Sequence, residues 1–133
     1  KSTLIMKVPG YKGMKTNKIV STLDIYPTML ELCNIDMPHQ TNGRSMVPLL
    51  NDPDDSNWEN TAYGYFRKGI TLRTDRYRLT KYFRDEEPVI ELYDHQTDPN
   101  ETVNIAPENL DIVNELMKTW EKGNTGLYQQ NRN

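Results

Sequence analysis

Apolar and polar positions alternate with a period of two through the middle of the chain, the spacing that is typical of half-buried β-strands. We expect four strands from this pattern: Thr61–Tyr65, Ile70–Arg73, Arg76–Phe83 and Val89–Tyr93. In the third strand, Leu79 and Tyr77 would face a core while Thr80 and the neighbouring arginines face outward. No helical pattern separates the four segments, so they predict a small antiparallel sheet.

A helical pattern follows the predicted sheet. Pro107 suits the first turn of a helix, where its missing N–H is not needed, and Gly123 would end the helix. Between them one stripe recurs at helical spacing: Leu110, Val113, Leu116, Met117 and Trp120. We expect this stripe to lie across one face of the sheet.

The part of the chain before Asn51 has a different pattern. The apolar run Thr3–Val8 stops at a Pro-Gly pair and predicts a buried strand. A helix is expected to begin at Asp24 and to end at Asn34, with one apolar face that includes Cys33. We expect Cys33 to pack in a core as an inert side chain.

A polar, acidic segment, Asn51–Asn60, marks the best internal boundary. Its first acidic residues have the spacing of a calcium loop, but Asn57 stands at the required glycine and Tyr63 at the closing glutamate. The segment therefore predicts a solvated loop without a metal ion.

Composition narrows the class of protein. Hydrophobic residues make up 35% of the 133 residues, which predicts a thin core or one shared with other polypeptide. A formal net charge of −3 argues against nucleic acid as the main partner. No segment approaches the roughly 20 apolar residues that a membrane-spanning helix needs. The single cysteine excludes an internal disulfide framework and a cysteine-based zinc site.

The search for a self-contained active site finds no convergent acid–base pair, metal cluster or activated nucleophile. His39 and His95 fall in predicted loops without a companion at ligand spacing. Arg67 and Lys68, between the first two predicted strands, could hold a sulfate or a carboxylate, or could simply be solvated.

Three further arginines lie in and around the next hairpin: Arg73, Arg76 and Arg78. Clustered at one edge they could also bind an anion. We favour the alternative that they form the solvated face of the sheet, paired with acidic side chains such as Asp75, Glu91 or Asp94.

Five strings occur in order along the chain: LIMKVPG, LDIYPTMLELCNI, GRSMVPLL, LRTDRYRLTKY and ELYDHQTDPNETVNIA. Together they resemble the C-terminal portion of a type I sulfatase, similar to the bacterial iduronate-2-sulfatase-like branch. The resemblance covers roughly Leu4 to Lys122.

The resemblance implies an α/β fold like that of alkaline phosphatase. Residues 1–52 would be the last strand and helices of the large N-terminal domain. Residues 53–133 would be the C-terminal subdomain, a four-stranded antiparallel sheet packed on a long helix. The rest of the sulfatase N-terminal domain would then be the main partner of this chain.

The same resemblance implies an enzyme that hydrolyses sulfate esters of sulfated glycans, such as glycosaminoglycans with 2-O-sulfated uronate, in the periplasm or outside the cell. Sulfatases use a formylglycine and a calcium ion. Cys33 does not stand in the formylglycine motif, and no catalytic or metal residue can be assigned in this chain. The fragment alone is expected to be inactive and to form the outer wall of the substrate pocket.

Substrate contact is what the resemblance can carry over to this chain, at Arg67 and Lys68. The loop that holds them approaches the pocket mouth in this branch. Family members often have Pro where this chain has Phe66, which weakens the transfer to Arg67.

Two other interpretations stay open. One is a related phosphatase or phosphotransferase of the same superfamily, which the upstream nucleophile motif would reveal. The other is a stand-alone, non-enzymatic module that binds acidic glycans. A sulfatase fragment, unlike a stand-alone module, is expected to expose the apolar surface between Leu4 and Leu50.

Overall fold

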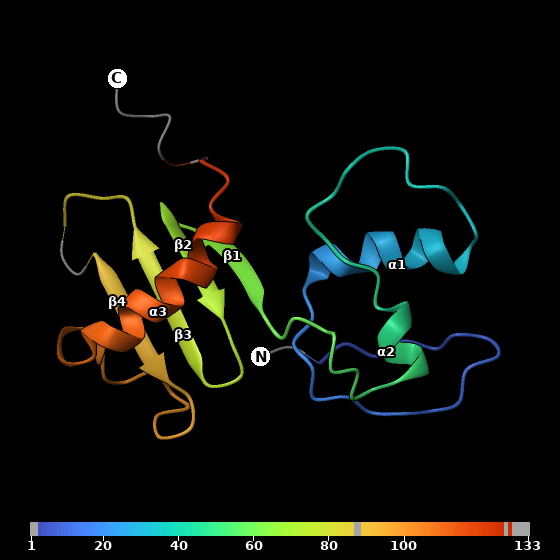
Figure 1. Cartoon of the computed structure of the whole chain (residues 1–133), viewed down its shortest axis with the longest axis horizontal. Helices are drawn as coiled ribbons and strands as arrows, with labels where there is room; N and C mark the ends of the chain where they lie inside the picture. The colour runs from blue at the N-terminus through green and yellow to red at the C-terminus, as the bar shows by residue number, and fades with distance from the viewer. Residues whose placement is uncertain (1–2, 87–88, 127, 129–133) are drawn as a thin grey trace. The chain divides into compact units, whose positions relative to one another are not determined.

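The computed structural model describes residues 3–86, 89–126 and 128. The chain divides into two compact units (Figure 1). Unit 1 comprises Lys1–Lys18 and Thr22–Glu59, and unit 2 comprises Ile19–Ser21 and Asn60–Asn133. The domain boundary predicted after residue 52 remains a prediction.

Unit 2 is built on a four-stranded antiparallel sheet in which neighbours in sequence are neighbours in space. The strands are β1 (Ala62–Phe66), β2 (Gly69–Arg73), β3 (Tyr77–Tyr82) and β4 (Ile90–Asp94). All four strands expected from the alternating pattern are therefore confirmed. Short links let each strand pair with the next, so hairpin geometry fixes the whole topology.

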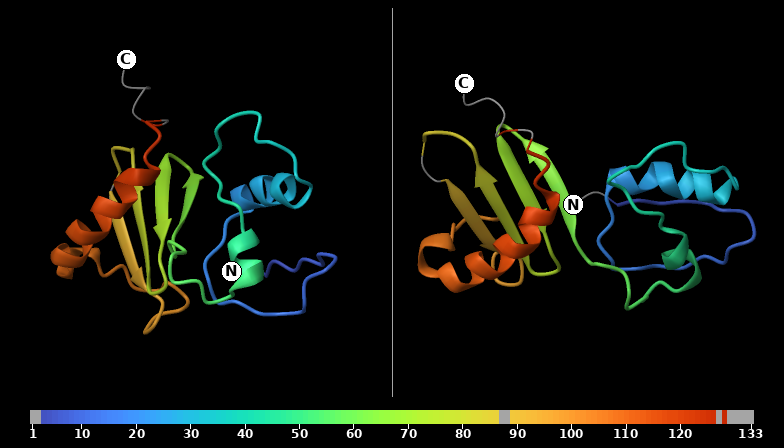
Figure 2. Two further views of the ribbon diagram at one scale, coloured as in Figure 1. Left: turned by 45° about the vertical axis from the view of Figure 1, so that its right-hand side comes forward. Right: turned by 45° about the horizontal axis from the view of Figure 1, so that its top comes forward.

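Helix α3 (Leu110–Trp120) lies across one face of this sheet (Figure 2). Three strands, α3 and the turn before α3 contribute to one buried cluster of side chains: Ile70, Leu72, Leu79, Leu92, Ala106, Val113 and Trp120. The Trp120 side chain is fully buried, and its Nε1 donates a hydrogen bond to the Ile70 carbonyl at 2.7 Å. The predicted helix on one sheet face is thus confirmed.

The start of the predicted helix was wrong. A separate 3-10 turn (Ala106–Glu108) precedes α3, and Asn109, whose φ of −130° and ψ of 50° are not helical, divides the two. As a result Leu110 is 63% exposed instead of lying on the buried stripe.

The face of the sheet opposite α3 is polar. Cross-strand partners Thr71 and Thr80 share a hydrogen bond between their hydroxyls at 2.8 Å. Thr80 was predicted to face outward into solvent, but it is buried. Its hydroxyl is satisfied by Thr71, which removes most of the cost of burial.

Unit 1 contains two short helices, α1 (Ile25–Leu32) and α2 (Val47–Asn51). Asp24 precedes α1 as predicted, but its carboxylate accepts the backbone N–H of Arg44 at 2.8 Å rather than capping its own helix. Asn34 has a φ of +52° and ends the helix, as expected for a left-handed residue at this position.

The apolar surface of unit 1 is largely exposed, which corrects two predictions. The segment Thr3–Val8 forms no strand, and Ile5 is 86% exposed. A strand needs a neighbour for its backbone groups, and none of the described residues provides one here. Cys33 is exposed rather than buried, because α1 packs inside unit 1 through Pro27 and Thr28 instead.

The expected exposure of the apolar residues in the first part of the chain is confirmed at nine positions: Leu4, Ile5, Met14, Leu23, Ile25, Tyr26, Met29, Ile35 and Met37. Within the described ranges, no helix is both long and apolar enough to cross a membrane.

Candidate functional site

The two predicted substrate-binding residues form the tip of the β1–β2 hairpin. Phe66 pairs with Gly69, so Arg67 and Lys68 alone make up the loop, with φ values of +48° and +59°. Two-residue loops of this kind require positive φ at both positions and normally use Asn or Gly. For other residues a left-handed conformation costs roughly 1–2 kcal/mol each. The loop therefore holds two cationic side chains in a strained backbone.

Neighbouring strands hold this strained turn in place. A Cβ added at Gly69 would lie 2.9 Å from the Tyr82 ring, so β2 approaches β3 there as only glycine permits. The Lys68 carbonyl accepts the backbone N–H of Phe83 at 2.7 Å. The turn is thus fixed to the end of β3.

Both cations at the hairpin tip are exposed, and an aromatic ring lies beside them. Phe66 is 69% exposed, and the Arg67 Cζ lies 5.1 Å from the centre of its ring. The structure brings Arg67 and Lys68 together as the sequence predicted. Their contact with a substrate stays a prediction.

At the opposite end of the sheet, Arg76 pairs with Asp94. Arg76 Nε donates to Oδ1 at 3.0 Å and Nη2 to Oδ2 at 2.7 Å. These bonds, with a further one from the Gln96 backbone N–H, lower the pKa of Asp94 from its ordinary 3.8 to about 2, although burial opposes the change. The predicted pairing with Asp94 is confirmed.

Arg78 pairs with Glu101, a residue that the sequence did not single out. Arg78 Nε donates to Glu101 Oε1 at 2.6 Å, and Nη2 donates to Oε2. His95 Nε2 lies 2.5 Å from the same Oε1. Burial alone would lower the pKa of Arg78 and raise that of Glu101, but the mutual hydrogen bonds reverse both effects.

The position of Glu101 depends on its backbone, which has a φ of +57°. The Asp98 carboxylate holds this turn by accepting the backbone N–H groups of Thr102 and Val103 at 2.6 and 2.9 Å. These bonds lower the pKa of Asp98, the one from Val103 most. A left-handed glutamate has no sequence signal, which explains why its pairing with Arg78 was missed.

Arg73 is the exception among the three arginines. Its side chain makes no hydrogen bond or ion pair with any described residue, and its Nη1 is buried. Asp75, one of its predicted partners, instead accepts a hydrogen bond from the Asn60 side-chain amide. Burial is the largest cause of a lowered pKa at Arg73, and Arg78 adds to it. The expectation of an acidic partner is therefore wrong for this residue.

The remaining candidates have local structural roles. Asp52 Oδ1 accepts the Asp54 backbone N–H at 3.0 Å, a local bond within a turn. The His39 ring stacks on Tyr26 with centres 5.8 Å apart. Among the described residues, no group of three or more His, Cys, Asp or Glu side chains could hold a metal ion.

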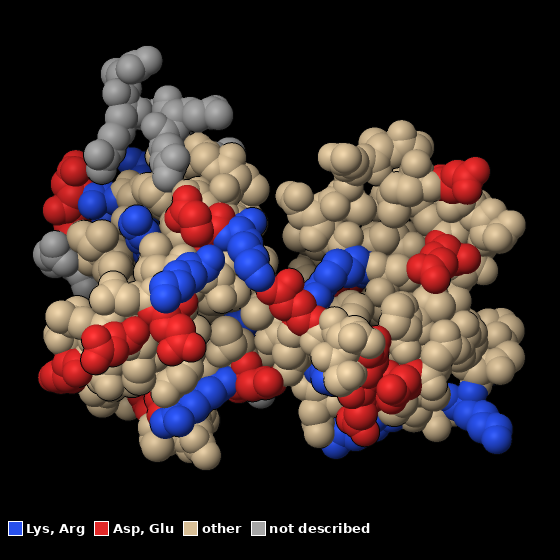
Figure 3. All heavy atoms as spheres, viewed as in Figure 1, with Lys and Arg blue, Asp and Glu red and all other residues tan. Residues whose placement is uncertain are grey.

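Charged groups of both signs alternate over the face of unit 2 in Figure 3. The exposed hairpin tip and Arg73 at the other end of the sheet supply hydrogen-bond donors with positive charge, whereas Arg76 and Arg78 already donate to acidic side chains. This arrangement suits the recognition of carboxylates and sulfates, which accept paired N–H donors from arginine.

Comparisons with known proteins give these features a context. Human arylsulfatase K is 28% identical over 97% of this chain. The frog enzyme from Xenopus laevis is 32% identical over 86% of the chain, and a sulfatase from the bacterium Formosa agariphila is 33% identical over 71%. The chain spans only 28%, 24% and 18% of these three relatives.

Solved structures show the same fold. BT4656, in complex with its substrate D-glucosamine-2-N,6-O-disulfate, matches 82% of this chain and 24% of its own, with 26% identity and a TM-score of 0.67. BT1596, a 2-O GAG sulfatase, matches 78% of this chain and 24% of its own, with 28% identity and a TM-score of 0.62. A phosphonate monoester hydrolase from Silicibacter pomeroyi matches 89% of this chain and 28% of its own with a TM-score of 0.76, but at 20% identity it shows the fold alone.

One family description matches nearly the whole chain. Residues 1–125 match N-sulphoglucosamine sulphohydrolase, C-terminal. The order of the predicted motifs, the sheet with its covering helix and the sulfatase relatives all agree with this match. The chain belongs to this family of sulfatase C-terminal regions.

Proposed function

We propose that this chain is the C-terminal part of a sulfatase that hydrolyses sulfate esters of sulfated glycans. The observation that carries the proposal is the family match over residues 1–125, combined with an exposed cationic hairpin in the matched region. Because the chain spans about a quarter of its relatives, the catalytic centre belongs to another part of the polypeptide in this proposal.

The role that we propose for this chain is to form the outer wall of the substrate pocket. Arg67 and Lys68 would contact the sulfate or the uronate carboxylate of the glycan. Arg67 supplies a planar guanidinium that can bind an oxyanion through two N–H groups, and Lys68 supplies a compact positive charge. The strained turn would keep both groups in one orientation before the substrate arrives, which lowers the ordering cost of binding.

For the substrate we propose a glycosaminoglycan that carries 2-O-sulfated uronate. Two similar structures support a glycosaminoglycan: one is described as a 2-O GAG sulfatase, and the other contains a disulfated glucosamine as its substrate. The pairing of a cation for the sulfate with a cation for the carboxylate fits a sugar that carries both groups. A location in the periplasm or outside the cell follows from this substrate and is part of the proposal.

Formylglycine and Ca²⁺ are the groups that a type I sulfatase uses to attack sulfur and to neutralise the sulfate oxygens. The residues described here do not fit a metal site of this kind, because no three candidate ligands converge. In our proposal both groups therefore belong to the part of the longer protein outside this chain, and no catalytic step is assigned to the residues described here.

The test uses the longer protein that contains this chain, with the double variant Arg67→Ala, Lys68→Ala. Removing both cations should raise the KM for a 2-O-sulfated uronate disaccharide about tenfold or more and leave kcat close to its original value, because binding alone is weakened. The matched control is Lys118→Ala, an exposed cation on α3, and it should leave both constants unchanged. An unchanged KM in the double variant would show that the hairpin does not contact the substrate.

A substrate panel separates the proposed activity from the related phosphatase or phosphonate hydrolase. The longer protein should release sulfate from the disaccharide and act at least about a hundredfold more slowly on matched phosphate and phosphonate monoesters. Faster hydrolysis of the phosphate or phosphonate monoesters would contradict the sulfatase and support the related phosphatase or phosphonate hydrolase. The 133-residue chain alone should release no sulfate. Measurable release by the chain alone would show that it has a catalytic centre of its own.

A further inference from the structure

Two arginines face each other on the polar face of the sheet, the face opposite α3. Arg73 on β2 and Arg78 on β3 are direct cross-strand partners. Like charges in this arrangement repel and weaken the strand pairing unless an anion offsets them. Glu101 offsets Arg78 through two hydrogen bonds, whereas Arg73 makes none with the described residues.

Two described acidic residues, Glu101 and Asp75, act on Arg73 through their charge, and both form hydrogen bonds with other residues. Glu101 uses both of its oxygens for Arg78 and one of them also for His95. Asp75 accepts a hydrogen bond from the Asn60 amide. Both carboxylates raise the pKa of Arg73 only through their charge, without a bond to its guanidinium. The charge is therefore partly offset, but the N–H donors are not satisfied.

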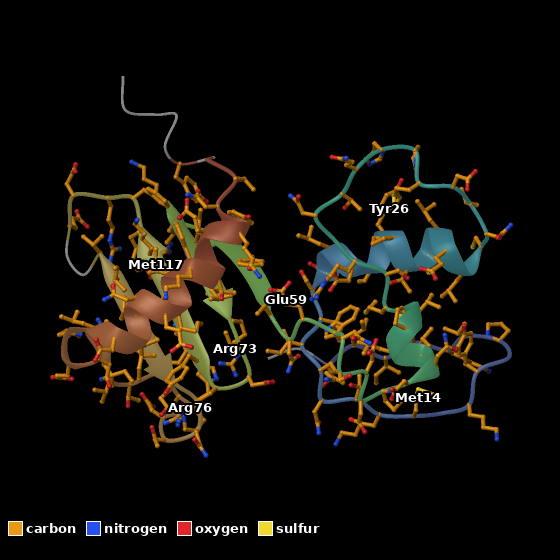
Figure 4. All side chains as sticks on the ribbon, viewed as in Figure 1. Met14, Tyr26, Glu59, Arg73, Arg76 and Met117 are labelled. Carbon is orange, nitrogen blue, oxygen red and sulfur yellow. The ribbon has the colours of Figure 1, made fainter. Side chains whose placement is uncertain are left out.

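The Arg73 side chain itself is half-buried, and its Nη1 is buried without a hydrogen-bond partner in residues 3–86, 89–126 and 128. Buried polar groups in proteins nearly always have partners, so an orphaned guanidinium nitrogen calls for an acceptor that the described residues do not supply. A charged donor next to a second cation favours an anionic acceptor over a neutral one. In Figure 4, Arg73 lies at the same end of the sheet as Arg76.

We propose that Arg73 is the centre of an oxyanion-binding site on the sheet face opposite α3, separate from the Arg67–Lys68 hairpin. The ligand is a carboxylate or a sulfate, held by paired N–H groups of the guanidinium, with the charge of Arg78 adding to the attraction. The oxyanion has two sources: a carboxylate side chain elsewhere in the longer protein, or a free sulfate ion. The site does not depend on the proposed catalytic activity.

The first experiment titrates the 133-residue chain with sodium sulfate at constant ionic strength. Binding is followed in NMR spectra through the side-chain Nε–H resonance of Arg73 and, in every variant, through the backbone amide resonances of Leu72 and Thr74. We expect saturable shifts of these resonances in the original chain, and about tenfold weaker binding or none, measured from the backbone amides, in Arg73→Gln. Arg67→Gln at the hairpin tip is the matched control and should bind sulfate at Arg73 as the original chain does. A linear, unsaturable response, or equal binding in Arg73→Gln, would overturn the proposal.

A second variant, Arg73→Lys, tests the site in case Arg73→Gln does not fold. It keeps the positive charge and loses the planar fork, so sulfate should bind about three- to tenfold more weakly while the circular dichroism spectrum is unchanged. Equal binding by Arg73→Lys and the original chain would also contradict a guanidinium site.

The longer protein distinguishes the two sources. If a carboxylate of the same protein occupies the site, added sulfate leaves the Arg73 resonance unchanged there, and Arg73→Gln lowers the melting temperature of the longer protein more than that of the chain. If free sulfate is the ligand, the saturable shift persists in the longer protein. The proposal would be refuted if sulfate caused no shift in the longer protein and Arg73→Gln destabilised the longer protein no more than it destabilises the chain.

Discussion

The two units of the chain differ in how far they bury their apolar side chains. Unit 2 places a fully buried leucine on each of three strands, Leu72, Leu79 and Leu92, directly across from one another, and covers them with Trp120 of α3. Unit 1 buries few large apolar side chains and leaves others exposed, with Met29 at 51%. Unit 2 therefore has a core of its own, and unit 1 has surface that other polypeptide would have to cover.

This difference shows that a short stretch of sequence folds by itself only when its own elements can cover one another. In unit 2 each strand pairs with the next in sequence, and the helix that covers them follows directly. In unit 1 the apolar run Thr3–Val8 has the composition of a strand but forms none. Exposed patches of this kind commonly mark interaction surfaces. We infer that unit 1 is completed by the rest of the proposed sulfatase.

The largest effect is expected from Trp120→Ala in unit 2. The substitution removes a fully buried ring and its hydrogen bond to the Ile70 carbonyl, so the free energy of unfolding should fall by about 3–5 kcal/mol. The counterpart in unit 1, Met29→Ala, should change it by less than about 0.5 kcal/mol. Urea denaturation followed by far-UV circular dichroism measures both. Equal losses of unfolding free energy in the two variants would contradict the difference between the two units.

Two glycines test packing in the two units. A Cβ at Gly123 would lie 2.1 Å from the Tyr63 ring, which is held by a bond from its hydroxyl to the Thr119 carbonyl. Gly123→Ala should therefore cost about 1–3 kcal/mol. Nothing lies within 4 Å of a Cβ at Gly13 in unit 1, so Gly13→Ala should be neutral or slightly stabilising. A neutral Gly123→Ala would show that the Tyr63 ring is free to move.

The acid sensitivity of the chain should arise in part from Asp94 in unit 2. Its pKa is about 2 in the folded state against an ordinary 3.8, so folding favours the ionised form of the Asp94 side chain. This contribution to stability is fully present above pH 3.8 and is lost as the pH falls towards about 2. When the free energy of unfolding is measured between pH 6 and pH 2, it should fall less steeply with decreasing pH in Asp94→Asn than in the original chain.

Arg76→Gln serves as the partner control, because Arg76 is the main cause of the lowered pKa. It should flatten the same part of the pH profile as Asp94→Asn. Profiles that match the original chain in both variants would assign the acid sensitivity to other carboxylates.

The last effect, a gain in stability, is expected at the hairpin tip. Replacing Arg67 by Asn and Lys68 by Gly puts residues that favour positive φ into the two-residue loop, which should raise the free energy of unfolding by about 1 kcal/mol. Thermal melts measure the gain in the chain alone. A loss of stability would mean that the original side chains support the turn through their contacts.

The strands and the covering helix were predictable because local patterns determine them. Strand pairs such as β2 and β3 are joined by short turns, so alternation and turn residues specified both their existence and their pairing. The failures came where distant context decides. Thr3–Val8 and Cys33 were expected to be buried by a core that unit 1 does not have.

The candidate site was predictable only in part. The position of Arg67 and Lys68 between two strands was clear from the spacing, and Asp94 was a natural partner for an arginine in the next hairpin. Glu101 was missed because its left-handed backbone, which turns the side chain towards Arg78, has no pattern in the sequence. Nor could the spacing show that Arg73 Nη1 has no hydrogen-bond partner in the described part of the chain, since that depends on where the carboxylates of other residues are bound.

Hydrogen–deuterium exchange on the 133-residue chain tests the difference between the units most directly. We predict slow exchange for backbone amides in strands β1 to β4 and in α3, and fast exchange across Thr3–Val8 and α1. The same measurement on the longer protein should show new protection in unit 1 and little change in unit 2. Equal protection of the two units in the chain alone would contradict the account.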